Sequence, residues 1–418
     1  MTNSNYYIWL QQALGAGAVT DRIFSFFSSP EEIFMSDEKA LKLSGVFSAR
    51  QIEKIKKTDI EKTYEILSVC GKEKVDVITP DTELYPKRLL EIRDFPLVLY
   101  TRGDMTCFKN RIPVAVVGTR KASELSRLAA EKLSRTLSSS GFLIVSGGAL
   151  GIDSAAHTGA IASGGKTVCV LGCGIGSSYL SENEPLRRAV SKNGVLVSEH
   201  PPLLPPARGS FPVRNRIIAG LCEGTVVIEA GVKSGSLITA RDANEMGRDV
   251  FAVPSDLLGT TCTGTRELIR DGAKTVRTSF DVLEEYLVRF PDKIIIDEKT
   301  DLSESITAYG VNAYPDLITE ITEQIKKDFK KSDTPVMMKE WVSKDAFSEE
   351  KIPKKRVLSE EASYQASKVY EVFDYKQKTV NEIMAEVNLP ASEIFGALTE
   401  LELLGYIAFL PNTKYKLI

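Results

Sequence analysis

Histidine is nearly absent from this chain, which has only His157 and His200 among its 418 residues. Its six cysteines are scattered and form no Cys-x-x-Cys pair. These shortages argue against a zinc site and against a disulfide framework, because both need clustered ligands or suitably placed thiols. We therefore expect no bound metal.

Long apolar runs are also missing, since no stretch approaches the roughly 20 residues that cross a membrane. The first residues, MTNSNYYIWLQQALGAG, lack the basic start and small-residue cleavage site of a secretory signal. We expect a cytoplasmic protein without membrane contact. The formal net charge of -3 disfavours bulk attraction to nucleic acid. A local basic patch remains compatible with it, because salt confines the relevant fields to about 10 Å.

Changes of pattern along the chain predict four segments. Residues 1–75 show helical apolar spacing and form a small helical domain, whose Gly15 to Gly17 turn either packs or, as in helix-hairpin-helix modules, meets a phosphate. Residues 76–290 form the core. Residues 291–357 are a charged linker with one helix near LITEITEQIKK. Residues 358–418 predict three helices and a hairpin, an order typical of a winged helix.

The core contains six apolar runs of strand length separated by amphipathic helices. Because these runs do not alternate with polar residues, they predict a parallel sheet covered on both faces, an α/β fold of Rossmann type. Ligands bind such sheets at the carboxyl ends of the strands. The runs are IPVAVVG, FLIVSGG, KTVCVLG, VLVSEH, TVVIEA and DVFAVP.

The loops after the first two runs are unusual. In VVGTRKAS a single glycine is followed by Arg120 and Lys121, so the GxGxxG dinucleotide fingerprint is absent and we expect no cofactor. In SGGALGIDSAAH, Gly147, Gly148 and Gly151 precede a helix, which is the geometry of an anion site. The alternatives are a solvated pair of cations in the first loop and a tight turn in the second.

Three further features follow in chain order. Lys166 precedes its strand, so its position indicates the opposite edge of the sheet and a surface lysine. In GSFPVRNRIIAG, Arg214 shares the apolar helix stripe and is expected to be ion-paired, whereas Asn215 and Arg216 point away and Arg216 is better placed to reach a ligand. EAGVKSGSLITA is a glycine-rich loop after a strand, with Ser234 and Ser236 leading into a helix.

These stretches resemble the DNA processing protein A (DprA/Smf) family. VAVVGTR, SGGALGIDSAAH, TVCVLGCGI, FPVRNRIIAGL, VVIEAGVKSGSLITARDANEMGRDVFAVP and GTRELIRDGA follow the family's order and spacing, and the likeness covers about Tyr85 to Ala273. It implies an N-terminal domain of sterile-alpha-motif type, an extended Rossmann core and a C-terminal winged helix. It also implies binding of single-stranded DNA, a homodimer through the Rossmann core and loading of RecA recombinase in natural transformation, without catalytic turnover.

Carried over by motif, the family's DNA-binding arginine falls on Arg120 and its lysine falls on Lys166, against the position argued from the strand. One departure is Leu150, which stands where the family usually has arginine. The predicted site for single-stranded DNA comprises Arg120, Lys121, Gly147, Gly148, Gly151, Lys166, Arg214, Asn215, Arg216, Ser234 and Ser236.

The sequence leaves two alternatives to DNA binding. A nucleotide phosphoribohydrolase would carry PGGxGTxxE, but aligning Gly235 and Ser236 with its Gly-Thr pair puts Thr239 in place of the glutamate, and a hydroxyl cannot stabilise positive charge as a carboxylate does. A protein scaffold is the other alternative. It is suggested by ASEIFGALTELELLG, which is acidic where a DNA-reading helix would be basic.

Overall fold

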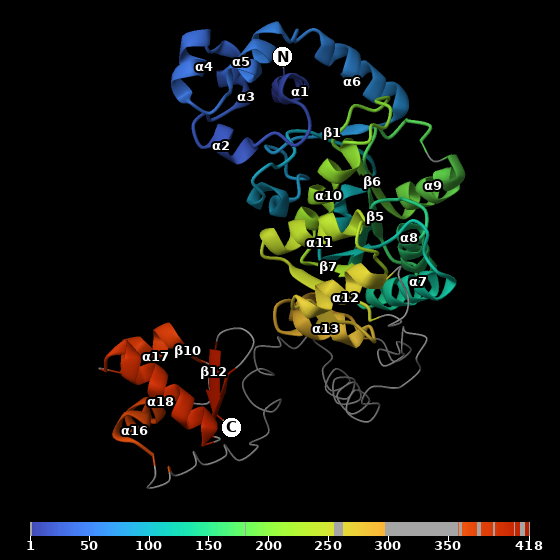
Figure 1. Cartoon of the computed structure of the whole chain (residues 1–418). Coiled ribbons are helices and arrows are strands. Elements are labelled where there is room, and N and C mark those ends of the chain that lie inside the picture. The colour runs from blue at the N-terminus through green and yellow to red at the C-terminus, as the bar shows by residue number, and fades with distance from the viewer. Residues whose placement is uncertain are drawn as a thin grey trace. The chain divides into compact units, whose positions relative to one another are not determined.

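The computed structural model separates into two compact units, residues 1–338 and 339–418, which are described one at a time (Figure 1). It describes residues 2–179, 181–254, 262–296, 358, 362–373, 378–387, 389–404, 406–409 and 414–417. The predicted linker lies outside the described residues from residue 297 to 357, as does the helix expected within it.

The first unit begins with six short helices, as the apolar spacing predicts. Side chains cap several of them: Ser29, Asp37 and Ser48 each accept a hydrogen bond from the backbone N–H three residues later. Their apolar faces meet around Trp9, which is 2 % exposed. The helices are α1 (Asn3–Leu14), α2 (Thr20–Phe24), α3 (Pro30–Met35), α4 (Glu38–Ser44), α5 (Ala49–Lys57) and α6 (Lys62–Glu73).

A nine-stranded sheet follows, in the order β1-β2-β6-β5-β4-β3-β7-β8-β9. All pairs from β6 to β9 are parallel, whereas β1 and β2 extend the β6 edge in antiparallel fashion. The six predicted apolar runs are β3 to β8, so this expectation is confirmed. The strands are β1 (Asp76–Ile78), β2 (Leu99–Gly103), β3 (Ile112–Val117), β4 (Phe142–Ser146), β5 (Thr167–Leu171), β6 (Gly194–Ser198), β7 (Gly224–Val227), β8 (Asp249–Ala252) and β9 (Lys274–Thr275).

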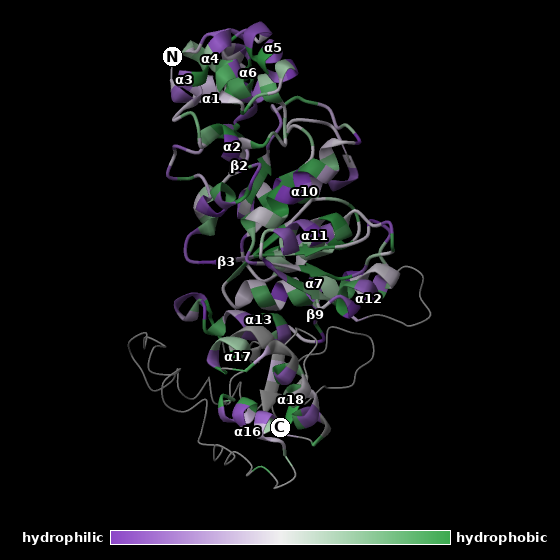
Figure 2. Ribbon diagram, turned by 60° about the vertical axis from the view of Figure 1, so that its left-hand side comes forward, coloured by the Kyte–Doolittle hydropathy of each residue, from purple (hydrophilic) through white to green (hydrophobic). Residues whose placement is uncertain are grey.

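Helices cover both faces of this sheet, which explains why its strands show no polar alternation. Along β3, Ala115 and Val117 belong to one hydrophobic core, while Val114 and Val116 belong to the other. Figure 2 shows the resulting apolar interior. The helices are α7 (Glu124–Ser139), α8 (Ile152–Ala162), α9 (Glu184–Asn193), α10 (Ser210–Leu221), α11 (Ser236–Glu245), α12 (Thr263–Arg270) and α13 (Phe280–Leu287).

The strand order reverses between β3 and β7. From β3 the chain continues to β4, β5 and β6 on one side, and then returns to β7, β8 and β9 on the other. The loops that leave β3 and β7 therefore diverge and open a crevice at their carboxyl ends. Such a reversal is where open α/β sheets bind their ligands.

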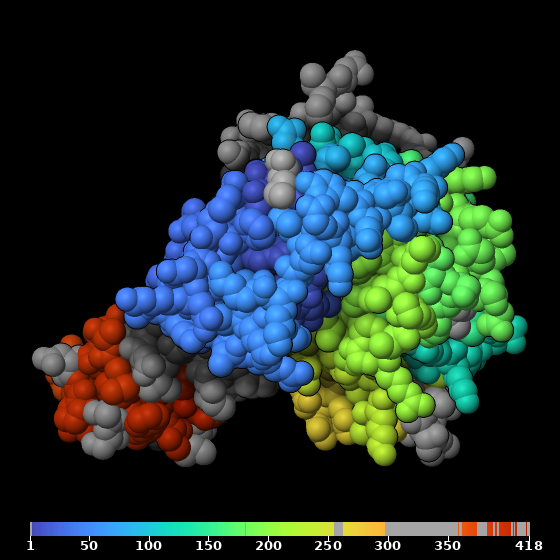
Figure 3. All heavy atoms as spheres, turned by 90° about the horizontal axis from the view of Figure 1, so that it is seen from above, coloured from blue at the N-terminus to red at the C-terminus, as the bar shows by residue number. Residues whose placement is uncertain are grey.

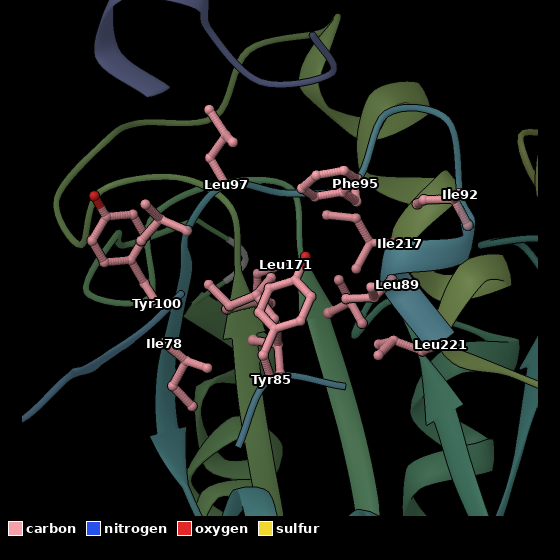
Figure 4. Packing of buried hydrophobic residues seen from close by; sticks show 14 of the residues in the cluster. Ile78, Tyr85, Leu89, Ile92, Phe95, Leu97, Tyr100, Leu171, Ile217 and Leu221 are labelled. Carbon is pink, nitrogen blue, oxygen red and sulfur yellow. The ribbon is translucent and has the colours of Figure 1, made fainter. Parts of the chain in front are cut away.

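The chain between β1 and β2 packs over α10 and holds it against the sheet (Figure 4). Leu89 and Ile92 lie beside Leu221 and Ile217 of α10, and they approach Gly220 so closely that a Cβ there would lie 3.0–3.2 Å from their side chains. Fully burying an aliphatic side chain such as Ile217 stabilises the fold by about 1.5–3 kcal/mol. Short 3₁₀ turns, Lys87–Glu91 and Met105–Phe108, flank β2.

The N-terminal helices and the sheet share one hydrophobic core. Hydrogen bonds also join them: the Gln11 side chain donates to the Glu199 carbonyl, and Thr20 Oγ1 donates to the Phe95 carbonyl at 2.9 Å. In Figure 3 the N-terminal helices, in blue, lie directly against the green atoms of the sheet region. The first unit is thus a helical cap fused to an α/β core.

The second unit has the predicted three helices and hairpin, with one additional short strand. Its three strands pair in the order β10-β12-β11. Its acidic helix, over residues 391–403, is hydrogen-bonded to the start of the helix over residues 364–371, because the Glu400 carboxylate accepts hydrogen bonds from Ser363 N (2.7 Å) and Oγ (2.6 Å). The elements are α16 (Tyr364–Glu371), β10 (Lys378–Thr379), α17 (Val380–Glu386), α18 (Ala391–Leu403), β11 (Ile407–Phe409) and β12 (Lys414–Leu417).

Candidate nucleic-acid interface

A pocket of about 330 Å³ opens at the reversal point between β3 and β7. The loops after β3 and β7 form two of its walls, and the start of α8 and the first turns of α10 form the others. This is the position that the parallel sheet predicts. The polar residues that line the pocket are Thr119, Arg120, Lys121, Asp153, Arg214, Asn215, Ser234, Ser236 and Thr239.

The loop after β3 exposes its two cations while its backbone is fixed. Ser123 caps α7, and the buried carboxylate of Glu229 accepts hydrogen bonds from Ser123 N and Oγ at 2.9 and 3.2 Å. Arg120 and Lys121 are both exposed. Within the described residues, the Lys121 ammonium makes no hydrogen bond or ion pair, so it is available to an anionic ligand.

Two aromatic rings stand beside Arg120. Its guanidinium carbon lies 5.2 Å from the centre of the Phe211 ring, and its Nη1 donates to the Tyr179 hydroxyl at 3.2 Å. The Tyr179 and Phe211 rings are themselves 5.2 Å apart. Sequence reasoning missed both rings, although Phe211 is the aromatic residue of the FPVRNR stretch. Rings next to cations can stack bases while the cations hold phosphates.

The glycine loop after β4 differs from the expected anion site, because the anion it holds is the protein's own. Ala149 N donates to Asp153 Oδ2 at 3.3 Å. Burial raises the pKa of Asp153, with nearby Arg214 opposing the rise. The glycines serve close packing: a Cβ on Gly148 would lie 2.4 Å from the Cys169 sulfur.

Arg214 is structural, as its place on the apolar stripe predicts, although its partners are carbonyls. Its Nη1 donates to the carbonyl of Gly147, just after β4, at 2.8 Å and to that of Val170 near the end of β5. Its Nε donates to Asn215 Oδ1, and Asn215 in turn donates to the Gly235 carbonyl at 3.1 Å. These two side chains line the pocket, and together they bond to the loop after β4, to strand β5 and to the loop after β7.

The expectation that Arg216 is better placed to reach a ligand is wrong. Arg216 is 5 % exposed, and its Nη2 donates to both carboxylate oxygens of Glu199, at 2.7 and 2.8 Å. Its Nε lies 3.1 Å from Asp94 Oδ2. Every residue of α10 from Arg214 to Leu221 is buried, because the segment between β1 and β2 covers the helix face that would otherwise be exposed to solvent.

Lys166 does not join the pocket either. It precedes β5 and therefore lies at the amino end of the sheet, as its position in the chain suggests and contrary to the transfer from the family motif. Gly151 packs against the Arg120 backbone, where a Cβ would meet the carbonyl at 2.6 Å. Ser234 and Ser236 line the pocket with their hydroxyls 2.8 Å apart. Leu150 leaves 38 % of its surface exposed.

The described residues contain neither a cluster of metal ligands nor a membrane-spanning helix. Among the residues that the structure describes, no three His, Cys, Asp or Glu side chains gather to hold a metal ion. Within that same part of the chain, every helix is too short or too polar to span a bilayer.

Comparison with known proteins agrees with this architecture. Residues 76–287 match the family model described as DNA recombination-mediator protein A, and residues 353–412 match the DprA winged helix domain. The chain is 38% identical over 233 residues to the DNA processing protein DprA of Bacillus subtilis, covering 55% of this chain and 78% of that protein. It is 43% identical over 205 residues to the Streptococcus pneumoniae protein, covering 49% and 72%.

Similarity in three dimensions leads to the same relatives. The X-ray structure of DNA processing protein A from Streptococcus pneumoniae superposes with a TM-score of 0.59 at 35% identity, covering 68% of this chain and 98% of that one. The family model alone spans half of the present chain and includes the whole pocket. This chain therefore belongs to the DNA recombination-mediator protein A family.

Proposed function

We propose that this protein binds single-stranded DNA in the pocket at the strand reversal. Arg120 and Lys121 contact phosphates, and bases stack on Phe211 and Tyr179. The observation that carries the proposal is the juxtaposition of two exposed cations with a pair of neighbouring rings at the ligand-binding edge of the sheet. Family membership supports a role in DNA recombination.

The rings favour single strands over duplexes. In a duplex both faces of each base are covered, so a ring such as Phe211 reaches a base only after unstacking it. Every base offers a π-face, and the cations contact the invariant backbone. Binding is therefore expected to tolerate changes of sequence and to weaken as salt concentration rises.

The pocket is proposed to bind without catalysing a reaction. Among the described residues that line it, the carboxylate is Asp153, which accepts a hydrogen bond from the Ala149 amide. Thr239, which stands where a phosphoribohydrolase would place its glutamate, lines the pocket with a hydroxyl. Incubation with nucleoside monophosphates is expected to release no free base. Release of base would favour the enzymatic alternative.

On the basis of the family resemblance, we also propose that the protein loads RecA onto the bound strand during natural transformation and that it forms a homodimer through the Rossmann core. A pull-down with RecA in the presence of single-stranded DNA tests the first, and sedimentation of the full chain tests the second. A chain that sediments as a monomer at all concentrations would contradict the dimer.

The second unit is proposed to serve contacts other than DNA. Its α18 exposes Glu393 and Glu402, which repel phosphates. Glu400 is committed to Ser363 within the same unit. We expect deletion of residues 358–418 to leave affinity for single-stranded DNA within about threefold, a change below 1 kcal/mol. A severe loss would show that this unit is a DNA contact.

The test of the main proposal is a titration of labelled oligonucleotides, single- and double-stranded, over a range of salt concentrations. The charge reversals Arg120→Glu and Lys121→Glu, made together, are expected to abolish binding of the single strand. The control pair is Arg188→Glu and Arg270→Glu, because these side chains are 69% and 74% exposed on other helices. Unchanged affinity in the first pair would overturn the proposal.

A further inference from the structure

A second hollow lies on the N-terminal helices and shares no residue with the pocket at the strand reversal. Its volume is about 440 Å³, and it is formed by the end of α1, one side of α5 and the start of α6. Four cations and two carboxylates line it, a formal excess of two positive charges in a chain whose net charge is -3. The lining residues are Gln12, Arg50, Glu53, Lys54, Lys57, Thr58, Asp59 and Lys62.

The carboxylates in this hollow are already engaged. Glu53 pairs with Lys57 at 2.6 Å, and Asp59 accepts a hydrogen bond from the backbone N–H of Glu61 at 3.0 Å. In the part of the chain that the structure describes, no carboxylate lies within ion-pair distance of Arg50, Lys54 or Lys62. Three exposed cations that make no ion pair with described residues therefore face the same hollow, and among the lining residues the Asp59 carboxylate, which likewise makes no ion pair, reduces their excess to two positive charges.

Helix stability does not account for these cations. The helix dipole favours positive charge near the last turn, which suits Lys54 at the end of α5. Arg50 is the second residue of α5 and Lys62 is the first of α6, and at these positions the dipole disfavours a cation. Two of the three cations thus stand where they weaken their own helices, and an anionic ligand would compensate for that cost.

The hollow is fixed to the rest of the first unit. Ile52 and Ile55 of α5 are buried on the opposite side of that helix, and the Trp9 indole donates to the Thr58 carbonyl at 3.0 Å. Gln11, next to the lining residue Gln12, donates to the Glu199 carbonyl just after β6. Figure 2 shows the outer side of α5 as hydrophilic. The cations are therefore presented by a supported scaffold.

We infer that this hollow is a second contact for single-stranded DNA, which binds phosphates of the strand held by the first pocket. This inference rests on the proposed function. No aromatic residue lines the hollow, so it offers charge without a stacking surface. The contact is thus to the backbone, independent of base identity, and extends the length of strand that the protein covers.

The test is a titration of the full chain with oligothymidylates of increasing length. The variant carries Arg50→Gln, Lys54→Gln and Lys62→Gln. The control carries Arg22→Gln, Lys39→Gln and Lys72→Gln, an equal loss of charge from exposed positions on α2, α4 and α6 that do not line the hollow. All six side chains are exposed, and thermal unfolding checks that both variants fold.

We expect the variant to bind the shortest oligonucleotides as the wild type does and to lose about tenfold in affinity for long ones. For long strands, the slope of log affinity against log salt is expected to fall by about 2, since each phosphate contact on a single strand contributes about 0.7. If the triple variant does not fold, Lys54→Gln and Lys62→Gln are measured singly, each with an expected fall of about 0.7.

Two results would overturn the inference while leaving the first pocket in place. One is equal affinity of variant and wild type at every length, with binding still lost on charge reversal of Arg120 and Lys121. The other is an equal loss of affinity in the control variant, which would show that the effect depends on the total charge of the protein and not on the hollow. If the wild type binds no oligonucleotide at all, the proposed function fails first, and this inference fails with it.

Discussion

Replacing Phe211 with alanine should weaken binding of single-stranded DNA without changing its dependence on salt. The ring lies beside Tyr179 and under the Arg120 guanidinium, at the mouth of the pocket. Loss of one base-stacking platform costs about 1–3 kcal/mol, which corresponds to a loss of affinity of about 5- to 150-fold. No charge is removed, so the number of released counter-ions stays the same.

Arg120→Gln gives the complementary result. It removes one phosphate contact, so the slope of log affinity against log salt should fall by about 0.7. The two side chains touch, since the guanidinium lies 5.2 Å from the ring centre. Their losses should therefore not add, and the double variant should show a coupling of about 0.5–1 kcal/mol.

Fluorescence anisotropy with a labelled oligothymidylate at several salt concentrations measures both quantities at once. Phe26→Ala is the matched control, because this phenylalanine is 57% exposed in the turn that follows α2. The affinity of this control variant for the oligothymidylate should equal that of the wild type. A reduced salt slope in Phe211→Ala, or an affinity that does not change, would refute the assignment of this ring as a base platform.

Three further predictions concern the framework of the fold. Burial lowers the pKa of His157 to about 3, so below pH 6.5 the unfolded chain binds a proton at this histidine that the native state does not bind. The free energy of unfolding should therefore fall by about 2 kcal/mol between pH 7 and pH 5. In His157→Gln, denaturant titration at the two pH values should show a smaller fall. Arg216→Gln leaves Glu199 buried without its partner, so calorimetry should show a destabilisation of about 3–5 kcal/mol, and an unchanged melting temperature would contradict the pairing. Gly147→Ala places a methyl group 2.7 Å from a guanidinium nitrogen and should cost about 1–3 kcal/mol of stability, whereas Gly209→Ala, with open space around it, should be neutral.

The sheet and the location of the pocket were predictable from the sequence because they depend on local patterns. Continuous apolar runs such as IPVAVVG identify buried parallel strands, and ligand loops must follow their carboxyl ends. The order of strands brings the loops after β3 and β7 together, and the chain supplies Arg120 in one and Ser236 in the other. The position of Lys166 just before β5 likewise indicates the amino end of the sheet, away from the pocket.

The environment of individual side chains could not be predicted in the same way. Helical periodicity assigned one buried face to α10, but the segment before β2 covers the other face, and so Arg216 became an internal ion pair. Nothing in the local sequence marks that cover, because its contacts with α10 link residues far apart in the chain. The ring pair of Phe211 and Tyr179 also forms only when separate loops meet.

The internal carboxylate of Asp153 has a consequence for how a strand lies in the pocket. Glycine-loop amides that remain open at a helix N-terminus can bind a phosphate directly. Here the Ala149 amide already donates to Asp153, which leaves the outer cations and rings to hold the ligand. Such a grip does not distinguish the end of a strand from its interior. We therefore expect the protein to bind a circular single strand as readily as a linear one.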